Sequence, residues 1–274
     1  MSPVMPETRQ PAAPPPTYPA GAPHSAGWLT DGLFLGAHRH AEGQLIYPAA
    51  GAMATTTERG TWIAPANRIT WTPPGFVHSH RIYGRTDVRI VVIPAELCGG
   101  LRSYPSVFVV SPLLREAILA LTDRLDVGTA AYGRLRAVVV DELVETTEHS
   151  LHLPDPRDDR LRVVTGLLHA DPATNATLGE LGRAAGASER TLSRLFHAEF
   201  GMSYHRWRTI LRIHHALLHL SNGRSVTDTA TACGWSNPTS FIEAFTALVG
   251  QTPGRYATDL SHAPLDPTGE GVTW

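Results

Sequence analysis

The sequence has no lysine, and all 23 of its basic side chains are arginine. Only two cysteines are present, Cys98 and Cys233, and neither belongs to a C-x-x-C pair. This pattern argues against disulfide bonding and favours a reducing cytoplasm. No apolar run approaches the ~20 residues of a membrane span, and no basic and apolar signal opens the sequence. We therefore expect a cytoplasmic protein without a membrane partner.

The sequence also lacks a strong charge of either sign, since its formal net charge is −2. Composition alone therefore does not predict a nucleic-acid partner. The distribution is more informative: residues 157–256 hold 11 Arg and 8 acidic residues, whereas residues 1–156 hold 12 Arg and 14 acidic residues. The basic excess falls on the C-terminal part and has the sign that phosphate neutralisation requires. At 274 residues the chain is long enough for two domains that each bury a core.

What the sequence does contain is a repeated pattern of two short helices joined by a turn. In residues 177–201, Thr177 and Glu180 form a T-x-x-E capping box, and Gly186 supplies the turn. Ser188 can cap a second helix, whose apolar positions recur at helical spacing, at Leu192, Leu195, Phe196 and Phe200. This helix leaves four polar side chains facing outward: Arg190, Thr191, Ser193 and Arg194. Because the N-terminal half of a recognition helix meets base edges in the major groove, these four are predicted to contact DNA.

The second copy of the pattern lies in residues 226–250. Ser225 and Asp228 form its cap, Gly234 is its turn, and its apolar face contains Phe241, Ala244, Phe245 and Leu248. One extra residue follows this turn, because the two turn glycines are 48 residues apart whereas Phe196 and Phe245 are 49 apart. On that alignment the outward positions are Thr239, Ser240, Ile242 and Glu243. The residues predicted to face a second groove are Asn237, Thr239, Ser240 and Glu243.

A long helix is predicted between the two units, over residues 203–223. Its apolar stripe contains Trp207, Ile210, Leu211, Leu217 and Leu218. About 18 residues of helix span roughly 27 Å. That length is close to the ~34 Å between successive major-groove faces on one side of a duplex. Two reading helices on such a spacer can occupy adjacent turns of DNA.

Residues 160–256 resemble the AraC/XylS-type family of transcription regulators. The resemblance is carried by Arg194-Leu195-Phe196, Gly201-Met202-Ser203, Trp207-Arg208, Ser225-Val226-Thr227, Cys233-Gly234-Trp235-Ser236, Pro238-Thr239-Ser240-Phe241, Ala244-Phe245 and Gly250-Gln251-Thr252-Pro253-Gly254-Arg255-Tyr256. It implies two recognition helices, over residues 189–199 and 238–249, that control transcription from promoter or operator DNA. Glu243 departs from the family, which often has Arg there. A carboxylate does not favour phosphate, although it can accept from a cytosine amino group, so we expect the second reader to contribute less.

Residues 28–94 have a different character. Short β-rich runs alternate with Gly and Pro turns, at residues 28–35, 44–49, 52–57, 62–64, 68–71, 80–83 and 88–93. Their close spacing predicts a small antiparallel barrel or jelly roll. The predicted fold class is therefore α+β with two domains: an antiparallel β-barrel with helices, followed by an all-α domain with two helix-turn-helix units.

Two histidine motifs lie in the β-rich region. His38 and His40 begin H-R-H-A-E-G-Q, which ends at Gln44, and P-P-G-F-V-H ends at His78, with His80 two residues further on. Alternate side chains of a strand share one face, so both imidazoles of the H-x-H pair can point into a barrel. The pattern resembles the paired motifs of the cupin family, H-x-H-x-x-x-E with a downstream Gly, here Gly51, and P-x-G-x-x-H. Gln44 replaces the glutamate of that family.

Two uses of these side chains stay open. His38, His40, Gln44 and His78 can offer three nitrogens and an amide oxygen to one divalent transition metal, Zn, Ni, Fe or Mn, with a position left for a ligand. Alternatively, the same residues form a polar lining that binds an organic effector without metal, and His80, on the same strand face as His78, can join it. The sequence names neither the effector nor a cofactor.

The remaining segments complete the predicted domain order. Residues 1–26 are rich in proline and are expected to be disordered. Residues 27–110 form the cupin-like barrel, residues 111–156 a helical segment, residues 157–258 the DNA-binding domain and residues 259–274 a flexible tail. Apolar residues at helical spacing in 111–156 predict two helices that either close the barrel or pack against a second chain, and the family resemblance favours a homodimer. Pro154-Asp155-Pro156 is the predicted hinge.

The predicted function is that of a sequence-specific transcription regulator whose cupin-like domain senses a small molecule or a metal. Its expected partners are double-stranded operator DNA, a small-molecule effector and a second copy of the chain, with RNA polymerase as a further candidate. The alternative is an enzyme, in which a metal-dependent cupin is fused to a DNA-binding domain. No positioned carboxylate base is visible beside the histidines, so the sequence favours a sensor without catalytic residues.

Overall fold

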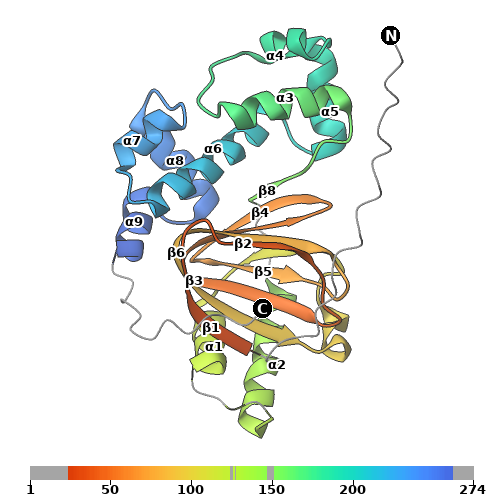
Figure 1. Cartoon of the computed structure of the whole chain (residues 1–274), viewed down its shortest axis with the longest axis vertical. Helices are drawn as coiled ribbons and strands as arrows, with labels where there is room; N and C mark the ends of the chain where they lie inside the picture. The colour runs from red at the N-terminus through yellow and green to blue at the C-terminus, as the bar shows by residue number, and fades with distance from the viewer. Residues whose placement is uncertain (1–23, 124–125, 127, 147–150, 262–274) are drawn as a thin grey trace, which may run out of the picture.

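Two long strands organise the N-terminal half of the protein (Figure 1). The computed structural model describes residues 24–123, 126, 128–146 and 151–261. Strand β3 (Gly43–Thr57) pairs antiparallel with β6 (His78–Ile93) along nearly its whole length, with register shifts between Pro48 and Ala52. One pair of strands therefore serves two halves of the sheet.

Six shorter strands complete an antiparallel sheet of eight strands in the described part of the chain. One half joins β2 (Phe34–His38), β4 (Gly60–Pro65) and β8 (His152–Leu153) to residues 52–57 of β3 and 78–83 of β6. The other half joins β1 (His24–Leu29), β5 (Arg68–Thr72) and β7 (Ser106–Val109) to residues 43–48 of β3 and 86–93 of β6. The two halves face each other across one buried cluster, made of Leu29, Ile46, Met53, Ala64, Ile82, Val88 and Ile90.

The α+β class is confirmed, but several predicted strand boundaries are wrong. The runs at 44–49 and 52–57 are one strand, and those at 80–83 and 88–93 another, because the pairing continues past Gly51 and Gly84. The run at 28–35 is broken by a turn between β1 and β2. Residues 24–26, which the sequence placed in a disordered tail, belong to β1, while residues 1–23 lie outside the described residues.

Two helices cover the outer face of one half of the sheet. Helix α1 (Pro112–Asp123) begins after Ser111, whose hydroxyl accepts from the Leu114 amide at 3.0 Å, and α2 (Ala130–Glu145) follows it. Their apolar faces share a core with the strands, made of Leu45, Tyr47, Ile69, Trp71, Val91, Ile93, Phe108, Leu114, Ala117, Ile118, Leu121, Tyr132, Val139 and Leu143. The helices thus close the sheet, the first of the two arrangements predicted for this segment. A short 3-10 helix, η1 (Ala95–Gly100), links β6 to β7.

Seven helices form the C-terminal part of the described chain: α3 (Asp159–Ala170), α4 (Leu178–Ala184), α5 (Glu189–Phe200), α6 (Tyr204–Ser221), α7 (Val226–Ala232), α8 (Pro238–Val249) and α9 (Pro253–Ser261). The capping box of Thr177 and Glu180 is present, and Ser225 caps α7 through the Asp228 amide. Gly186 and Gly234 adopt the left-handed backbone, with φ of +63° and +79°, that their turns require. The predicted helix-turn-helix units and the 18-residue spacer α6 are confirmed. The predicted flexible tail began at residue 259, but residues 259–261 belong to α9. Residues 262–274 lie outside the described residues.

The spacer α6 separates two hydrophobic cores. Its first half contributes Tyr204, Trp207, Ile210 and Leu211 to the core of the first unit, and its second half contributes Ile213, Ala216, Leu217 and Leu220 to the core of the second. The second core also contains Ala54 of β3, Ile63 of β4 and Leu151, so it is shared with the β-domain. From the β-domain side, the first core takes only Leu153 of β8 among the described residues.

None of the helices in the described ranges is both long enough and apolar enough to cross a membrane.

Candidate functional site

Helix α5 presents the first set of predicted DNA contacts. The Ser188 hydroxyl accepts from the Thr191 amide at 3.2 Å and so caps the helix. Leu192, Phe196 and Phe200 are buried. On the opposite face Arg190 and Arg194 are exposed, and Thr191 and Ser193 are half-buried. The two arginines are therefore placed where a phosphate or a base edge can reach them.

Helix α8 presents the second set. The Asn237 side-chain oxygen accepts from the Thr239 amide at 2.9 Å, so this residue caps the helix. Phe241 and Phe245 are buried, whereas Thr239, Ser240 and Glu243 are exposed. The sequence predicted Asn237 as a DNA contact, and its position adds a local capping role.

The two reading helices lie toward opposite ends of α6 (Figure 1). Arg212 of α6 holds the loop after α3 by donating to the carbonyls of Pro172 at 2.9 Å and Thr174 at 3.0 Å. Its guanidinium also lies 5.5 Å from the centre of the Trp235 ring, beside the second turn. Arg212 therefore ties the two units together, a role that the helical spacing of the sequence did not reveal.

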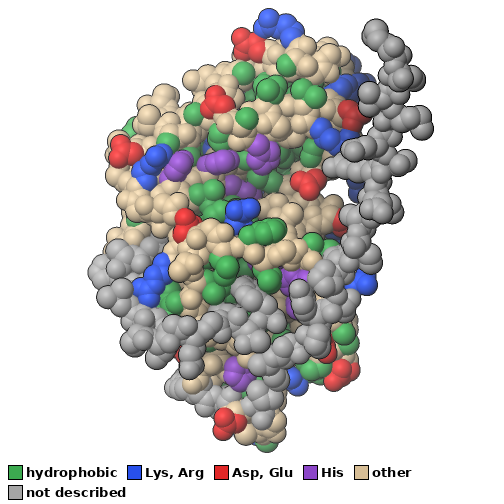
Figure 2. Space-filling view, viewed as in Figure 1, with side chains coloured by type: hydrophobic (Ala, Val, Ile, Leu, Met, Phe, Trp, Pro, Cys, Tyr) green, Lys and Arg blue, Asp and Glu red, His purple; other side chains and the backbone are tan. Residues whose placement is uncertain are grey.

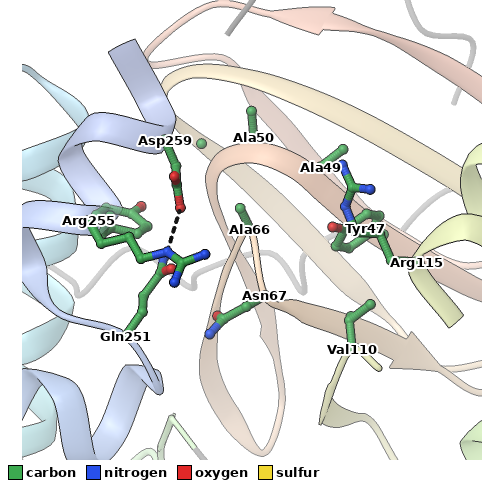
Figure 3. A pocket seen from close by; sticks show the side chains of 12 residues that line it. Tyr47, Ala49, Ala50, Ala66, Asn67, Val110, Arg115, Gln251, Arg255 and Asp259 are labelled. Carbon is green, nitrogen blue, oxygen red and sulfur yellow. Dashed lines mark ion pairs between the residues drawn. The ribbon is translucent and has the colours of Figure 1, made fainter. Parts of the chain in front are cut away.

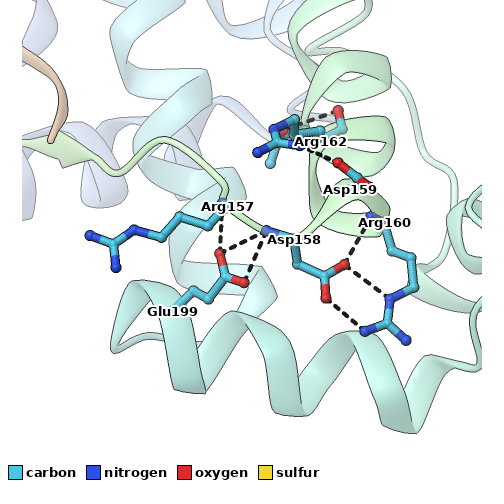
Figure 4. Close-up of polar contacts among 7 residues, drawn as sticks. Arg157, Asp158, Asp159, Arg160, Arg162 and Glu199 are labelled. Atoms are coloured by element: carbon cyan, nitrogen blue, oxygen red, sulfur yellow. Dashed lines mark hydrogen bonds and ion pairs between the residues drawn. The ribbon is translucent and has the colours of Figure 1, made fainter. Parts of the chain in front are cut away.

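The C-terminal end of α5 is fastened inside its own domain (Figure 4). The Glu199 carboxylate accepts from the backbone amides of Arg157 at 2.8 Å and Asp158 at 3.1 Å. Asp158 in turn caps α3 through the Arg160 amide at 2.9 Å. The predicted hinge at residues 154–156 thus ends at a fixed point on the first unit.

The histidine motifs meet inside the β-domain. His38 ends β2 and His78 begins β6. His40, which was expected to follow His38 on the same strand, instead lies two residues beyond the end of β2. All three are buried, and their candidate ligand nitrogens lie within 4.8 Å of one another. His80 joins them, with its ring centre 4.9 Å from that of His78. The structure therefore brings together the histidines that the two motifs predicted.

Hydrogen bonds orient these imidazoles. Nδ1 of His38 contacts the Gly36 carbonyl at 2.8 Å, and Nδ1 of His78 contacts the Phe76 carbonyl at 2.9 Å. A carbonyl only accepts, so each Nδ1 carries the proton and each Nε2 keeps a lone pair. Burial lowers the pKa of His78 to about 3, and it also lowers the pKa of His38 and His80. His38, His78 and His80 are therefore held as neutral imidazole, the form that coordinates metals.

Gln44 completes the cluster. Its Nε2 lies 3.4 Å from Nε2 of His40, and its side-chain oxygen is buried with no hydrogen-bond partner among the described residues. The Thr55 hydroxyl, 3.1 Å from Nδ1 of His80, is a neighbour that the sequence did not single out. Only the pairing of strands could have indicated Thr55, because this residue lies opposite His80 where β3 pairs with β6.

A cavity of about 470 Å³ lies where the β-domain meets the helices. Phe34, Ile63 and Tyr83 line it from the sheet, and Trp207, Leu211 and Leu218 from α6. His169, His214 and His215 also reach it, and Figure 2 shows histidine side chains gathered over this helical boundary. The junction is thus a second region where neutral imidazoles and apolar side chains meet.

Paired, capped recognition helices with exposed polar faces define a DNA-binding protein of the helix-turn-helix class. The sequence model of the family described as a helix-turn-helix domain matches residues 181–259. The HTH-type transcriptional regulator NimR of Escherichia coli (strain K12) is 32% identical over 241 residues, which is 85% of each chain. The HTH-type transcriptional regulator RipA of Corynebacterium glutamicum is 33% identical over 106 residues, 39% of this chain and 31% of that one.

The chain therefore belongs to the AraC/XylS-type family of helix-turn-helix transcription regulators. Among solved structures, ToxT from Vibrio cholerae is 9% identical with a TM-score of 0.39, and the similarity covers 87% of this chain and 98% of that one.

Proposed function

We propose that this transcription regulator is a sensor whose β-domain binds a small effector or a divalent metal at the histidine cluster and thereby controls operator binding. The observation that carries the proposal is the cluster itself: three buried imidazoles whose ligand nitrogens lie within 4.8 Å of one another. Ligand binding changes operator affinity only if the ligand prefers one arrangement of the two domains.

The donor set fits a divalent transition metal. In both His38 and His78, Nδ1 donates to a backbone carbonyl and Nε2 keeps its lone pair. Such outer hydrogen bonds are typical of metal-binding histidines. His40 is the third nitrogen ligand, and the buried Gln44 oxygen is a fourth, neutral one. A bound Zn, Ni, Fe or Mn ion would supply a Lewis-acidic site that holds an anionic or carbonyl-bearing effector.

Metal analysis of the protein tests this site. We expect protein purified without chelator to hold one divalent ion per chain and His78→Ala to hold none. His205→Ala is the matched control, because that histidine is exposed on α6. Gln44→Glu should tighten binding by about tenfold or more, since it exchanges a neutral ligand for a charged one. If the protein binds none of the four ions but its operator affinity changes when a metabolite is added, the cluster binds an organic effector instead.

Operator binding is proposed to use both reading helices. Arg190 and Arg194 contact bases or phosphates in the first groove, with shorter contacts from Thr191 and Ser193. Thr239 and Ser240 contact the second groove, together with Asn237 and Glu243. Hydroxyl-radical footprinting on DNA selected by the purified protein should show two protected segments about one helical turn, ~10 base pairs, apart. A single protected segment would contradict use of both helices.

A homodimer is proposed through α1 and α2. The side chains of Leu113 and Val144 are 55% and 49% exposed although both helices already pack on the sheet. Sedimentation velocity should find a dimer that Leu113→Asp dissociates. A wild-type protein that stays monomeric at micromolar concentration would contradict it.

The second candidate function is a metal-dependent enzyme, and the three-histidine cluster is the observation that favours it. The described cluster contains no Asp or Glu among its ligand group, whereas proton transfer usually needs a positioned acid or base. Metal-loaded protein assayed for turnover with candidate cupin substrates separates the two: turnover lost in His78→Ala would establish the enzyme.

A further inference from the structure

The β-domain touches the second recognition helix at its C-terminal end. Asn67 Nδ2 donates to the Val249 carbonyl, and Arg68 Nη2 donates to the Leu248 carbonyl at 3.3 Å. The last carbonyls of a helix have no partner within the helix, and a cation there meets the negative end of the helix dipole. Two side chains at the start of β5 therefore cap α8 from another domain. We call Asn67 and Arg68 the clamp.

Arg68 is unusually placed for a clamp residue. It is 3% exposed, burial lowers its pKa, and no carboxylate of the described residues lies within ion-pair distance of it. A buried cation is unfavourable unless polar groups surround it. Here the carbonyls of Asn67 and Leu248 accept from Nη1 and Nη2, whereas Nε has no hydrogen-bond partner among the described residues. Arg68 also shares its strand face with Thr72, which pairs with Gln44 of the histidine cluster. Strand β5 thus runs from the sensor site to the clamp.

The clamp acts on one reading helix only. The C-terminal end of α5 is fastened by Glu199 to the start of its own domain, at Arg157 and Asp158. The end of α8 is fastened by the β-domain, whose Ala54 and Ile63 also enter the core of the second unit. The reading surface of α8, at Thr239, Ser240 and Glu243, stays exposed. The clamp therefore orients this helix without covering it.

Beside the clamp the two domains leave open space between them (Figure 3). A cavity of about 450 Å³ opens beside Asn67, lined by Ala49, Ala50 and Ala66 on one side and by Gln251 and Arg255 on the other. The small alanine side chains leave this space open. On its other side Arg255 forms an ion pair at 4.0 Å with Asp259 of its own helix. The two hydrogen bonds of the clamp can consequently break while the shared core around Ala54 and Ile63 stays packed.

We propose that Asn67 and Arg68 are positioning residues for DNA recognition: they set the orientation of the second reading helix, so that the sensor acts on the second half-site and not on the first. The proposal rests on the reading role assigned to α8 above. Arg212 and Trp235 hold the start of α8 within the DNA-binding domain, and the clamp holds its end.

The test compares two clamp variants with a matched arginine variant. Asn67→Asp places an acceptor against the Val249 carbonyl at the negative end of the helix, and Arg68→Met keeps a long side chain without donors. Arg102→Ala is the control, because its side chain is exposed on the β-domain away from α8. In footprinting, we expect the clamp variants to need about tenfold more protein to protect the second half-site, with the first half-site and the control unchanged. Equal loss at both half-sites, no loss, or a gain at the second would overturn the proposal.

A measurement without DNA guards against misfolding. Hydrogen exchange of residues 238–249 should rise in the clamp variants while residues 189–200 and the strands stay protected. The double variant Thr239→Ala, Ser240→Ala separates this proposal from the proposed function. If that variant leaves the second half-site protected, the reading role of α8 fails. If it removes protection and the clamp variants do not, the clamp alone fails.

Discussion

His214 is a buried imidazole at the centre of the domain junction. Its side chain is 5% exposed, and its Nε2 donates to the Leu151 carbonyl at 2.9 Å. Burial lowers its pKa to about 3, with His215, His169 and His152 as the neighbouring titratable groups. The folded protein therefore keeps this residue neutral at pH values where an unfolded chain protonates it.

The expected consequence is a loss of stability in acid. Below the ordinary pKa of 6.5 the unfolded chain binds a proton that folded His214 does not, so the free energy of unfolding falls as pH falls from 6.5 towards 3. Between pH 7 and pH 5 the free energy of unfolding should fall by about 2 kcal/mol more for wild type than for His214→Gln. The glutamine amide can still donate to the Leu151 carbonyl. Urea unfolding at each pH measures the difference, and parallel curves for the two proteins would refute it.

Arg190 is the exposed cation nearest the start of α5. Arg190→Ala should weaken operator binding by ~1–3 kcal/mol and relax selectivity at one base pair if the guanidinium reads a base. Affinities measured on a set of operators with single base changes distinguish this from a phosphate contact, which weakens all of them equally. Arg102→Ala again serves as the control. An unchanged operator affinity in Arg190→Ala would show that Arg190 does not contact DNA.

Glu243 is exposed at the position where the family often carries a cation. Because a carboxylate repels phosphate, Glu243→Ala should leave operator affinity unchanged or tighter when measured by anisotropy. A large loss of affinity would show instead that the carboxylate accepts a hydrogen bond, as from a cytosine amino group.

At the scale of elements, the helices were predicted well and the strands only in part, since the runs at 62–64 and 68–71 match β4 and β5 but several other strand boundaries do not. The bounds of α5 and α8 agree with prediction within a residue, because Ser188, Pro238 and the glycines after each helix act locally. Strands β3 and β6 were divided wrongly because Pro48, Gly51 and Gly84 are typical of turns, whereas pairing over most of their length carries both strands through. The histidine cluster was foreseen from two motifs, but the clamp was not, since Asn67 and Val249 are distant in sequence.

The junction of α3 and α5 gives a prediction at this scale. Glu199→Ala removes the acceptor of two backbone amides at the start of α3 and should lower the free energy of unfolding by ~1–3 kcal/mol. Glu116→Ala, at an exposed site on α1, is the control and should change little. Chemical unfolding measures both, and equal stabilities would show that the hinge needs no such anchor.

At the scale of the whole molecule, the structural division differs from the division along the chain. The second helix-turn-helix unit shares a core with the β-domain through Ala54, Ile63 and Leu151, whereas the first unit keeps a core nearly its own. Sequence periodicity showed that Leu217 faces inward, but nothing in it indicated that β3 and β4 lie on the other side. Such contacts depend on how the domains dock, which no local pattern encodes.

The shared core predicts how destabilisation spreads. Leu217 is fully buried, and Leu217→Ala should lower the free energy of unfolding by ~2–5 kcal/mol. Hydrogen exchange should then rise in both the second unit and strands β3 and β4. Leu192→Ala, equally buried in the first core, should raise exchange in α3, α4 and α5 while those strands stay protected. Identical exchange patterns for the two variants would contradict the division.

The same shared core limits how this regulator can be recombined with others. A chimera cut at Pro154-Asp155-Pro156 and joined to a foreign sensor would keep the complete first unit but expose the faces of Ile213, Leu217 and Leu220 that the native sheet covers. Unless the new sensor offers a matching apolar face, such a hybrid should tend to aggregate and to lose half of its operator specificity. Tyr204, Trp207, Ile210 and Leu211 of the same helix lie in the first core, so α6 cannot be transplanted apart from the first unit either.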